Sequence, residues 1–125
     1  HAIELLAKAY GDLRGARVAV LGAAYRAGVK ETAFSGVFAA VDALTAKGAV
    51  VSVHDPLYSD EELTRIGFKA HSLGSDVDAA VIQTDHADYR SLSATELPGA
   101  KVLVDGRNIV TQAWDGMVLV TLGRA

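Results

Sequence analysis

The sequence predicts an α/β fold with three layers, in which a mostly parallel sheet carries helices on both faces. Short, continuously apolar segments alternate with helical patterns along the chain. Strands that are buried on both faces of a parallel sheet have this appearance. The 125 residues, half of them hydrophobic, are enough for one domain with one core.

In the first half of the chain, apolar residues recur at helical spacing before Gly15, which is expected to end the first helix. Ser35 is expected to cap the next helix and Gly48 to close it. Pro56 ends the strand before it, because proline cannot continue a central strand. The predicted elements are a helix over 3–13, a strand over 17–21, a loop over 23–32, a helix over 36–47 and a strand over 49–53.

In the second half, an acidic first turn after Ser59 predicts a helix that Gly67 ends, since acidic side chains suit a helix N-terminus. Ser93 is expected to cap another short helix that ends before Pro98. The predicted elements are a helix over 60–66, a short strand over 68–71, a strand over 79–83, a helical turn around 89, a helix over 94–97, and strands over 101–104 and 117–121.

Composition narrows the classes of partner. The net charge of −3 and the isoelectric point near 5.7 argue against a nucleic-acid partner. The sequence contains no cysteine, which excludes a thiol nucleophile or a thiolate metal site in this chain and fits a cytoplasmic protein. No apolar run approaches the roughly 20 residues that span a bilayer, so no membrane partner is expected.

Two strand ends carry the residues that we select as a binding site. ARVAVLGAAYR ends in Tyr25 and Arg26, and KVLVDGR ends in Arg107. Ligands of open α/β sheets bind beyond the carboxyl ends of the strands, and a guanidinium can bind a phosphate through two hydrogen bonds. The sequence therefore predicts one anionic ligand between Arg26 and Arg107. Tyr25 either stacks on a ring of the ligand or packs into the core, and the residues favour neither.

Other polar residues near strand ends have structural interpretations. Asp55 and Asp105 can each hold a ribose hydroxyl or brace a turn through backbone amides, and Asp105 can also orient Arg107. We favour the turn for Asp55 and a structural role, orienting Arg107 or bracing the turn, for Asp105. Asp85 and His86 follow a strand, where such a pair can serve acid/base chemistry, but we favour a helix-capping role for Asp85. The histidines lack the spacing of metal ligands, and no serine lies on a nucleophile elbow, so neither a metal nor a catalytic residue is assigned.

The first strand is followed by Gly22-Ala23-Ala24-Tyr25-Arg26-Ala27-Gly28. A dinucleotide site requires the pattern G-x-G-x-x-G at the start of a helix, and here the middle glycine is missing and the helix begins late. The sheet is Rossmann-like, but self-contained NAD binding is not expected.

Four segments in natural order resemble the C-terminal, nucleotide-sugar-binding domain of the UDP-glucose/GDP-mannose dehydrogenase family. They read VAVLGAAYR, GAVVSVHDP, AAVIQTDHADYR and VLVDGRNIV. The resemblance implies that residues 1–14 are the end of a connecting helix from a missing central region, and that residues 15–125 form the nucleotide-sugar-binding domain. We therefore expect a piece of a longer enzyme.

The resemblance further implies an NAD-dependent, two-step oxidation of a sugar C6 hydroxyl to a carboxylate by a homodimer, with the NAD domain and the catalytic cysteine elsewhere in the parent. Tyr25, Arg26 and Arg107 would contact a nucleotide-diphosphate sugar, and this chain alone would be inactive. The family usually has lysine at Arg26 and an NAD-contacting arginine at Ala33. Lys30 is our candidate for the missing charge at the cofactor. The alternatives are a non-catalytic nucleotide-sugar-binding module and a structural dimerisation module.

Overall fold

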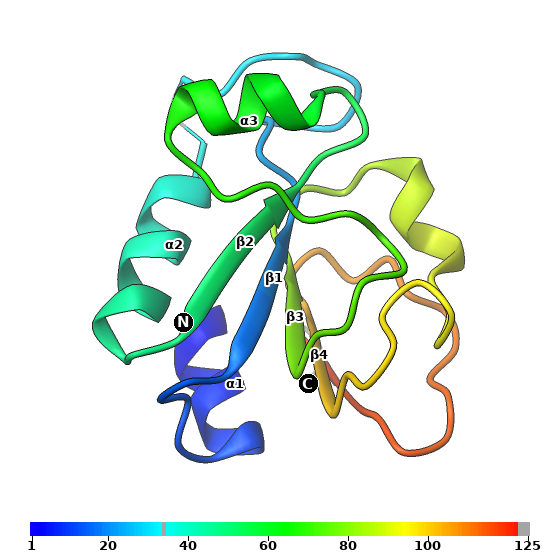
Figure 1. Cartoon of the computed structure of the whole chain (residues 1–125). Helices are drawn as coiled ribbons and strands as arrows, with labels where there is room; N and C mark the ends of the chain where they lie inside the picture. Colours follow the sequence, from blue (N-terminus) through cyan, green and yellow to red (C-terminus); the bar gives the residue numbers. More distant parts are fainter. Residues whose placement is uncertain (34, 123–125) are drawn as a thin grey trace.

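A five-stranded parallel sheet forms the centre of the computed structural model, which describes residues 1–33 and 35–122. The strands lie in the order β2-β1-β3-β4-β5, and Figure 1 labels the first four of them in this order. Their bounds are Arg17–Leu21 for β1, Val50–His54 for β2, Ala79–Ile82 for β3, Val102–Asp105 for β4 and Val118–Thr121 for β5. The predicted α/β fold with a parallel sheet is confirmed. Each of these strands corresponds to an apolar run in the sequence.

The strands end almost level with one another. Leu21 of β1 pairs with His54 of β2 and with Ile82 of β3, and Ile82 pairs in turn with Asp105 of β4. The turns that follow β1, β2, β3 and β4 therefore meet at one edge of the sheet, called the carboxyl edge below.

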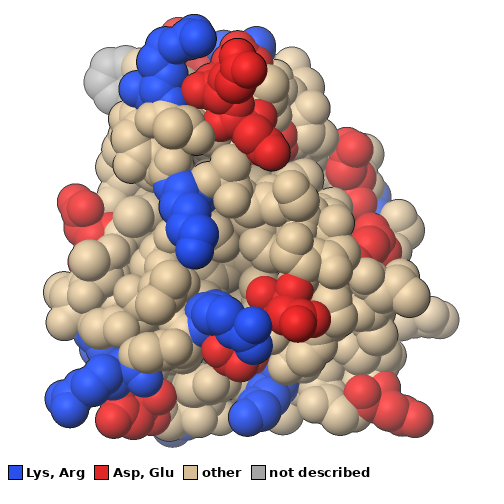
Figure 2. Space-filling view, in the orientation of Figure 1, with Lys and Arg blue, Asp and Glu red and all other residues tan. Residues whose placement is uncertain are grey.

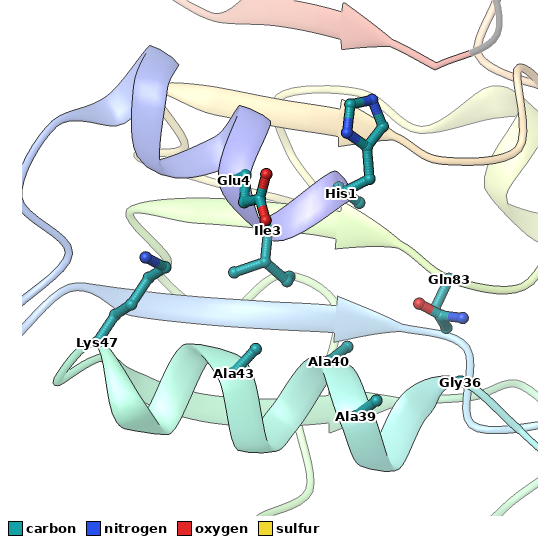
Figure 3. Close-up of a pocket in the computed structure, with 10 residues that line it drawn as sticks. His1, Ile3, Glu4, Gly36, Ala39, Ala40, Ala43, Lys47 and Gln83 are labelled. Atoms are coloured by element: carbon teal, nitrogen blue, oxygen red, sulfur yellow. The ribbon is translucent and has the colours of Figure 1, made fainter.

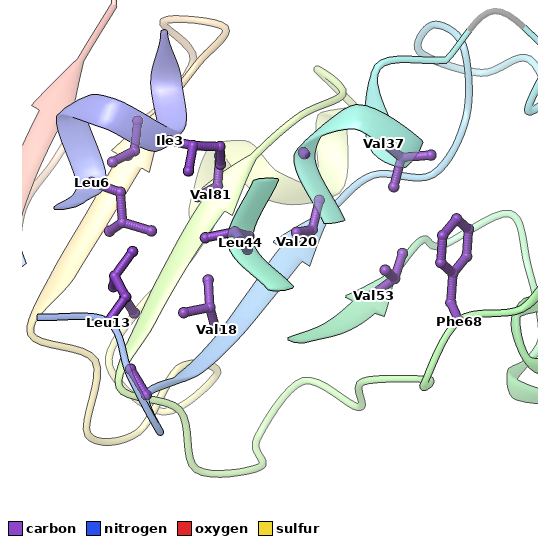
Figure 4. Close-up of a cluster of buried hydrophobic side chains, with 14 of the residues drawn as sticks. Ile3, Leu6, Leu13, Val18, Val20, Val37, Leu44, Val53, Phe68 and Val81 are labelled. Carbon is purple, nitrogen blue, oxygen red and sulfur yellow. The ribbon is translucent and has the colours of Figure 1, made fainter. Parts of the chain in front are cut away.

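Two α-helices cover one face of the sheet. Helix α1, Ala2–Tyr10, lies over β3, β4 and β5, and α2, Val37–Ala46, lies over β1 and β2. Their apolar side chains meet the strands in one cluster, in which Leu6 and Leu44 are fully buried (Figure 4). Burial of one such leucine contributes about 1.5–3 kcal/mol.

The second face is covered by a 3₁₀ helix and by extended loops. This helix, η1, Ala87–Ser91, places Tyr89 in a second apolar cluster with Leu97 and Leu103. Helix α3, Asp60–Ile66, lies beyond the arrowhead of β2 at the carboxyl edge (Figure 1). Its N-terminus has a capping box, formed by Ser59 and Glu62, in addition to the expected acidic first turn.

Two predicted elements are wrong. Residues 68–71 contribute one bridge, Val53 to Ala70, rather than a strand: Val53 donates to the carbonyl of Lys69 and accepts from the amide of His71. Residues 94–97 form a hydrogen-bonded turn rather than a helix. Pro98 disfavours helical backbone in the residue before it, so the turn does not extend.

Two helix ends also differ from expectation. Helix α1 ends at Tyr10, because Gly11 takes a φ of 103° and the Asp12 carboxylate accepts from the Arg14 amide. Gly36 rather than Ser35 is the N-cap of α2. No helix within residues 1–33 and 35–122 is both long and apolar enough to cross a membrane.

Candidate functional site

The turns that carry Arg26 and Arg107 lie on the two sides of the end of β3. They follow β1 and β4, which both pair with β3 at the carboxyl edge. Neighbouring strands are about 4.8 Å apart, so the two turns start about 10 Å from each other. The sheet thus brings to one edge the two arginines that the sequence analysis selected.

A buried carboxylate holds the turn after β4. Asp105 is fully buried, and its Oδ2 accepts from the amides of Ile109 and Val110 at 2.8 and 2.7 Å. Its Oδ1 accepts from the amide of Arg107 at 3.1 Å. Asp105 therefore braces the turn, as predicted, and does so through backbone amides.

Close backbone packing at Gly106 also shapes this turn. A Cβ there would lie 2.6 Å from the carbonyl oxygen of Ile82. Asn108 takes a φ of 58°, the left-handed conformation that asparagine tolerates better than most residues. The backbone that presents Arg107 is thus held by its neighbours before any ligand arrives.

A second buried carboxylate holds the turn after β1. Asp55 Oδ2 accepts from the amides of Ala23 and Ala24 at 2.8 and 3.0 Å, and its Oδ1 accepts from the amide of Leu57 at 2.8 Å. The Thr84 hydroxyl donates to the carbonyl of Ala24 at 2.8 Å. The bracing role predicted for Asp55 is confirmed. Asp55 braces its own turn after β2 and also joins it to the turn after β1.

His86 is a member of this site that the sequence analysis did not select. It is buried, and its Nε2 lies 2.9 Å from Asp55 Oδ2. Its Nδ1 lies 3.4 Å from the amide nitrogen of Gly28 in the loop after β1. The available signal was its position directly after β3, between the two arginine-bearing turns.

The side chains proposed to meet the ligand are exposed above these turns. Tyr25 is 54% exposed, so it does not pack into the core, and Arg26 is exposed. The Arg107 side chain is 46% exposed and lies 4.0 Å from Asp85 Oδ1. The expected capping role of Asp85 is wrong, since η1 has His86 as its N-cap and no side-chain cap.

Lys30 points its charge at α3. Its ammonium forms an ion pair with Glu62 and lies 5.4 Å from the centre of the Tyr58 ring. The hydrogen bond from Lys30, together with the one from the Ser59 amide, lowers the pKa of Glu62 from 4.5 to about 2. Lys30 thereby ties the loop after β1 to α3, and its role at a cofactor stays a prediction.

The turn after β1 does not fit a dinucleotide. In a phosphate-binding turn the backbone amides face the pyrophosphate. Here the amides of Ala23 and Ala24 are bonded to Asp55, and the Thr84 side chain fills the space beside Gly22. The residues present therefore do not form an NAD site at this turn.

Tyr89 links η1 to the end of β2. Its hydroxyl donates to the carbonyl of His54 at 3.1 Å and lies 2.9 Å from His54 Nδ1. Burial raises the pKa of Tyr89 and lowers the pKa of His54.

Among the described residues, no group of three or more His, Cys, Asp or Glu side chains is arranged to hold a metal ion.

A hollow of about 390 Å³ lies between α1 and α2, away from the predicted residues (Figure 3). Its walls include Ile3, Ala40 and Ala43, and one end reaches Gln83. None of Tyr25, Arg26, Lys30 and Arg107 lines it.

On the face shown in Figure 2, basic and acidic side chains are interspersed.

Comparison with known proteins yields a family match. The model of the UDP-glucose/GDP-mannose dehydrogenase family, UDP binding domain, matches residues 19–112. The UDP-glucose 6-dehydrogenase of Rhizobium meliloti (strain 1021) is 30% identical over 135 residues, covering 97% of this chain and 30% of that protein.

Solved structures show the same fold. The structure of UDP-D-ManNAc dehydrogenase from Pyrococcus horikoshii matches with a TM-score of 0.81 and 28% identity, covering 98% of this chain and 30% of that one. A UDP-glucose dehydrogenase from Pyrobaculum islandicum matches with a TM-score of 0.73 and 26% identity, covering 95% and 28%. The chain thus spans about 30% of the length of the relatives that it matches.

Proposed function

The chain belongs to the UDP-glucose/GDP-mannose dehydrogenase family, in its UDP-binding domain, and from this premise we propose that it holds the nucleotide part of a nucleotide-diphosphate sugar at the carboxyl edge of its sheet. The observation that carries the proposal is the pair of exposed arginines on two turns, each braced by a buried carboxylate.

Arg26 and Arg107 would bind the diphosphate. A guanidinium presents paired donors that match two phosphate oxygens, and charge-assisted hydrogen bonds are about twice as strong as neutral ones. Tyr25, with more than half of its surface exposed, offers a ring face to the base or the sugar. Because Asp55 and Asp105 hold both turns in the free chain, little ordering is required when the ligand binds.

Asp85 competes with the ligand for the guanidinium of Arg107. Its carboxylate lies 4.0 Å from the Arg107 guanidinium, and both side chains are over a third exposed. Such an exposed pair is worth about 0–1 kcal/mol, so a doubly charged diphosphate competes with it easily.

The parent protein is proposed to be an NAD-dependent dehydrogenase that oxidises the sugar C6 hydroxyl to a carboxylate. This chain lacks cysteine and uses the amides after β1 internally, so NAD and the catalytic thiol would belong to other parts of the parent. The part of the reaction carried out here is positioning, and the chain alone would be inactive. We propose a cytoplasmic homodimer for the parent.

Calorimetry on the 125-residue chain tests this proposal. UDP, UDP-glucose, UDP-N-acetylmannosamine, GDP-mannose and NAD would be titrated into the wild type, Arg107→Ala and Arg17→Ala. Arg17 is the matched control, because it is also an exposed, ion-paired arginine, but at the opposite end of β1, where it binds Asp78.

We expect one nucleotide-sugar to saturate the wild type and Arg17→Ala, and Arg107→Ala to bind it about 10- to 100-fold more weakly, the effect of losing charged hydrogen bonds. Equal affinity in both variants would contradict the assignment of Arg107. If none of the five compounds binds, the nucleotide-sugar proposal fails for this chain and a structural module is favoured.

A further inference from the structure

His86 contacts two different segments through its two ring nitrogens. Nε2 lies 2.9 Å from Asp55 Oδ2, and Nδ1 lies 3.4 Å from the amide nitrogen of Gly28. A backbone amide can donate but not accept, so Nδ1 is the acceptor and the ring proton on Nε2 donates to Asp55. One neutral imidazole therefore satisfies both contacts.

Tyr89 packs against the His86 ring. The two rings meet edge to face, with centroids 5.8 Å apart. Tyr89 is itself fixed, because it is fully buried and its hydroxyl donates to the carbonyl of His54. The imidazole thus contacts η1 through Tyr89 and the turn after β2 through Asp55.

The loop over residues 25–31 is closed on itself. The Tyr25 amide donates to the Glu31 carbonyl at 2.6 Å, and the Val29 amide donates to the Arg26 carbonyl at 3.2 Å. These bonds connect the loop to itself, so its position over the sheet depends on its contacts with the rest of the protein. Two polar ties are the contact from Gly28 to His86 and the ion pair of Lys30.

One oxygen atom connects the base of this loop to its tip. Asp55 Oδ2 accepts from the amides of Ala23 and Ala24 at the base, and through His86 it reaches Gly28 at the tip. Arg26 lies between these two points. A shift of the imidazole would therefore move the guanidinium relative to Arg107.

We propose that His86 is a positioning residue for the nucleotide-sugar site, acting through Gly28 to set the place of Tyr25 and Arg26. This inference rests on the proposed function. His86 is buried, so its effect on ligand affinity is exerted through the loop and not by contact with the ligand.

The decisive variant is His86→Gln. A glutamine amide nitrogen can occupy the place of Nε2 and donate to Asp55, but no acceptor remains for the amide of Gly28. His86→Asn is the complementary variant, since its side-chain oxygen can occupy the place of Nδ1 and accept from Gly28. The matched control is His71→Gln, which removes another buried imidazole, one whose Nε2 has no hydrogen-bond partner among the described residues.

Three quantities would be measured on the 125-residue chain: UDP affinity by calorimetry, exchange of the Gly28 amide by NMR, and the urea midpoint. We expect His86→Gln to weaken UDP binding about fivefold, the effect of one hydrogen bond, and to speed exchange at Gly28. His86→Asn should preserve the protection of Gly28 better than His86→Gln. The His71→Gln control should leave affinity and Gly28 exchange unchanged, even where its urea midpoint falls.

Two failures are distinguishable. If the wild type binds UDP and Arg107→Ala binds it more weakly, but His86→Gln binds as tightly as the wild type, the role of His86 is overturned and the proposed function stands. If the wild type binds neither UDP nor any of the other four compounds titrated above, the proposed function fails, and the positioning role fails with it.

Discussion

Replacing Asp55 by asparagine should destabilise the protein far more than its near-isosteric size suggests. The carboxylate accepts from the amides of Ala23, Ala24 and Leu57 and from His86, all within 3.0 Å. An asparagine has one acceptor oxygen, and three of the four donors share Oδ2, so the oxygen should stay there and turn the amide nitrogen toward the Leu57 amide.

The expected loss follows from these four bonds. The unpaired amide costs about 1 kcal/mol, at the low end for a partly buried group, and the three remaining bonds each lose about 1 kcal/mol of charge assistance. We therefore expect the free energy of unfolding to fall by about 4 kcal/mol. A domain with about 5–15 kcal/mol of stability remains folded after this change.

Asp105→Asn is the matched comparison. Its oxygen can keep the amides of Ile109 and Val110, and only the longer bond from the Arg107 amide is lost. The same reasoning gives a loss of about 2–3 kcal/mol. Asp42→Asn, on the exposed side of α2, should change the stability by less than about 0.5 kcal/mol.

Urea unfolding followed by the fluorescence of the single tryptophan, Trp114, measures all three losses. Trp114 packs against the apolar cluster on the second face, so its emission should report unfolding. A loss for Asp55→Asn equal to or smaller than that for Asp105→Asn, at an unchanged dependence on urea, would refute the idea that bond count and charge at Asp55 determine its contribution.

Three further predictions concern the turns and the titrating groups. Gly22→Ala should lower the free energy of unfolding in urea by more than about 2 kcal/mol, since φ is 113° and a Cβ would overlap Thr84. Gly28→Ala should lower it by only about 1 kcal/mol, because φ is 72° and the space around a Cβ is open. The depressed pKa of Glu62 stabilises the fold above pH 4.5 and this stabilisation is lost as the pH falls toward 2, so Glu62→Gln should show a smaller loss of stability over that window; an unchanged pH profile would count against the ion pair. Burial lowers the pKa of His71 below 6.5, so the unfolded chain takes up protons more readily and stability falls as the pH drops below 6.5, by at most about 1.4 kcal/mol per pH unit. This acid loss should shrink in His71→Gln, and an undiminished loss would show that another group titrates.

The positions of the two arginine-bearing turns can be predicted from the sequence. The apolar runs before Gly22 and Asp105 were sufficient to predict two parallel strands, and parallel strands end at one edge. The sequence does not decide whether Tyr25 packs into the core or stays exposed, because its position next to a strand end is compatible with both. The structure leaves it exposed.

Hydrophobic runs and turn chemistry within a few residues are enough to predict the strands of the sheet, their parallel arrangement, and the local bracing of the Leu57 amide by Asp55 and of the turn after β4 by Asp105. The longer reach of Asp55 to the amides of Ala23 and Ala24 is not among these local features. The tertiary structure decided which groups meet: His86 with Asp55 across 31 residues, and Gly28 with His86 across 58. Such pairs depend on the order and register of the strands. Local patterns do not encode that order, because every buried strand of a parallel sheet presents the same apolar surface to its neighbours.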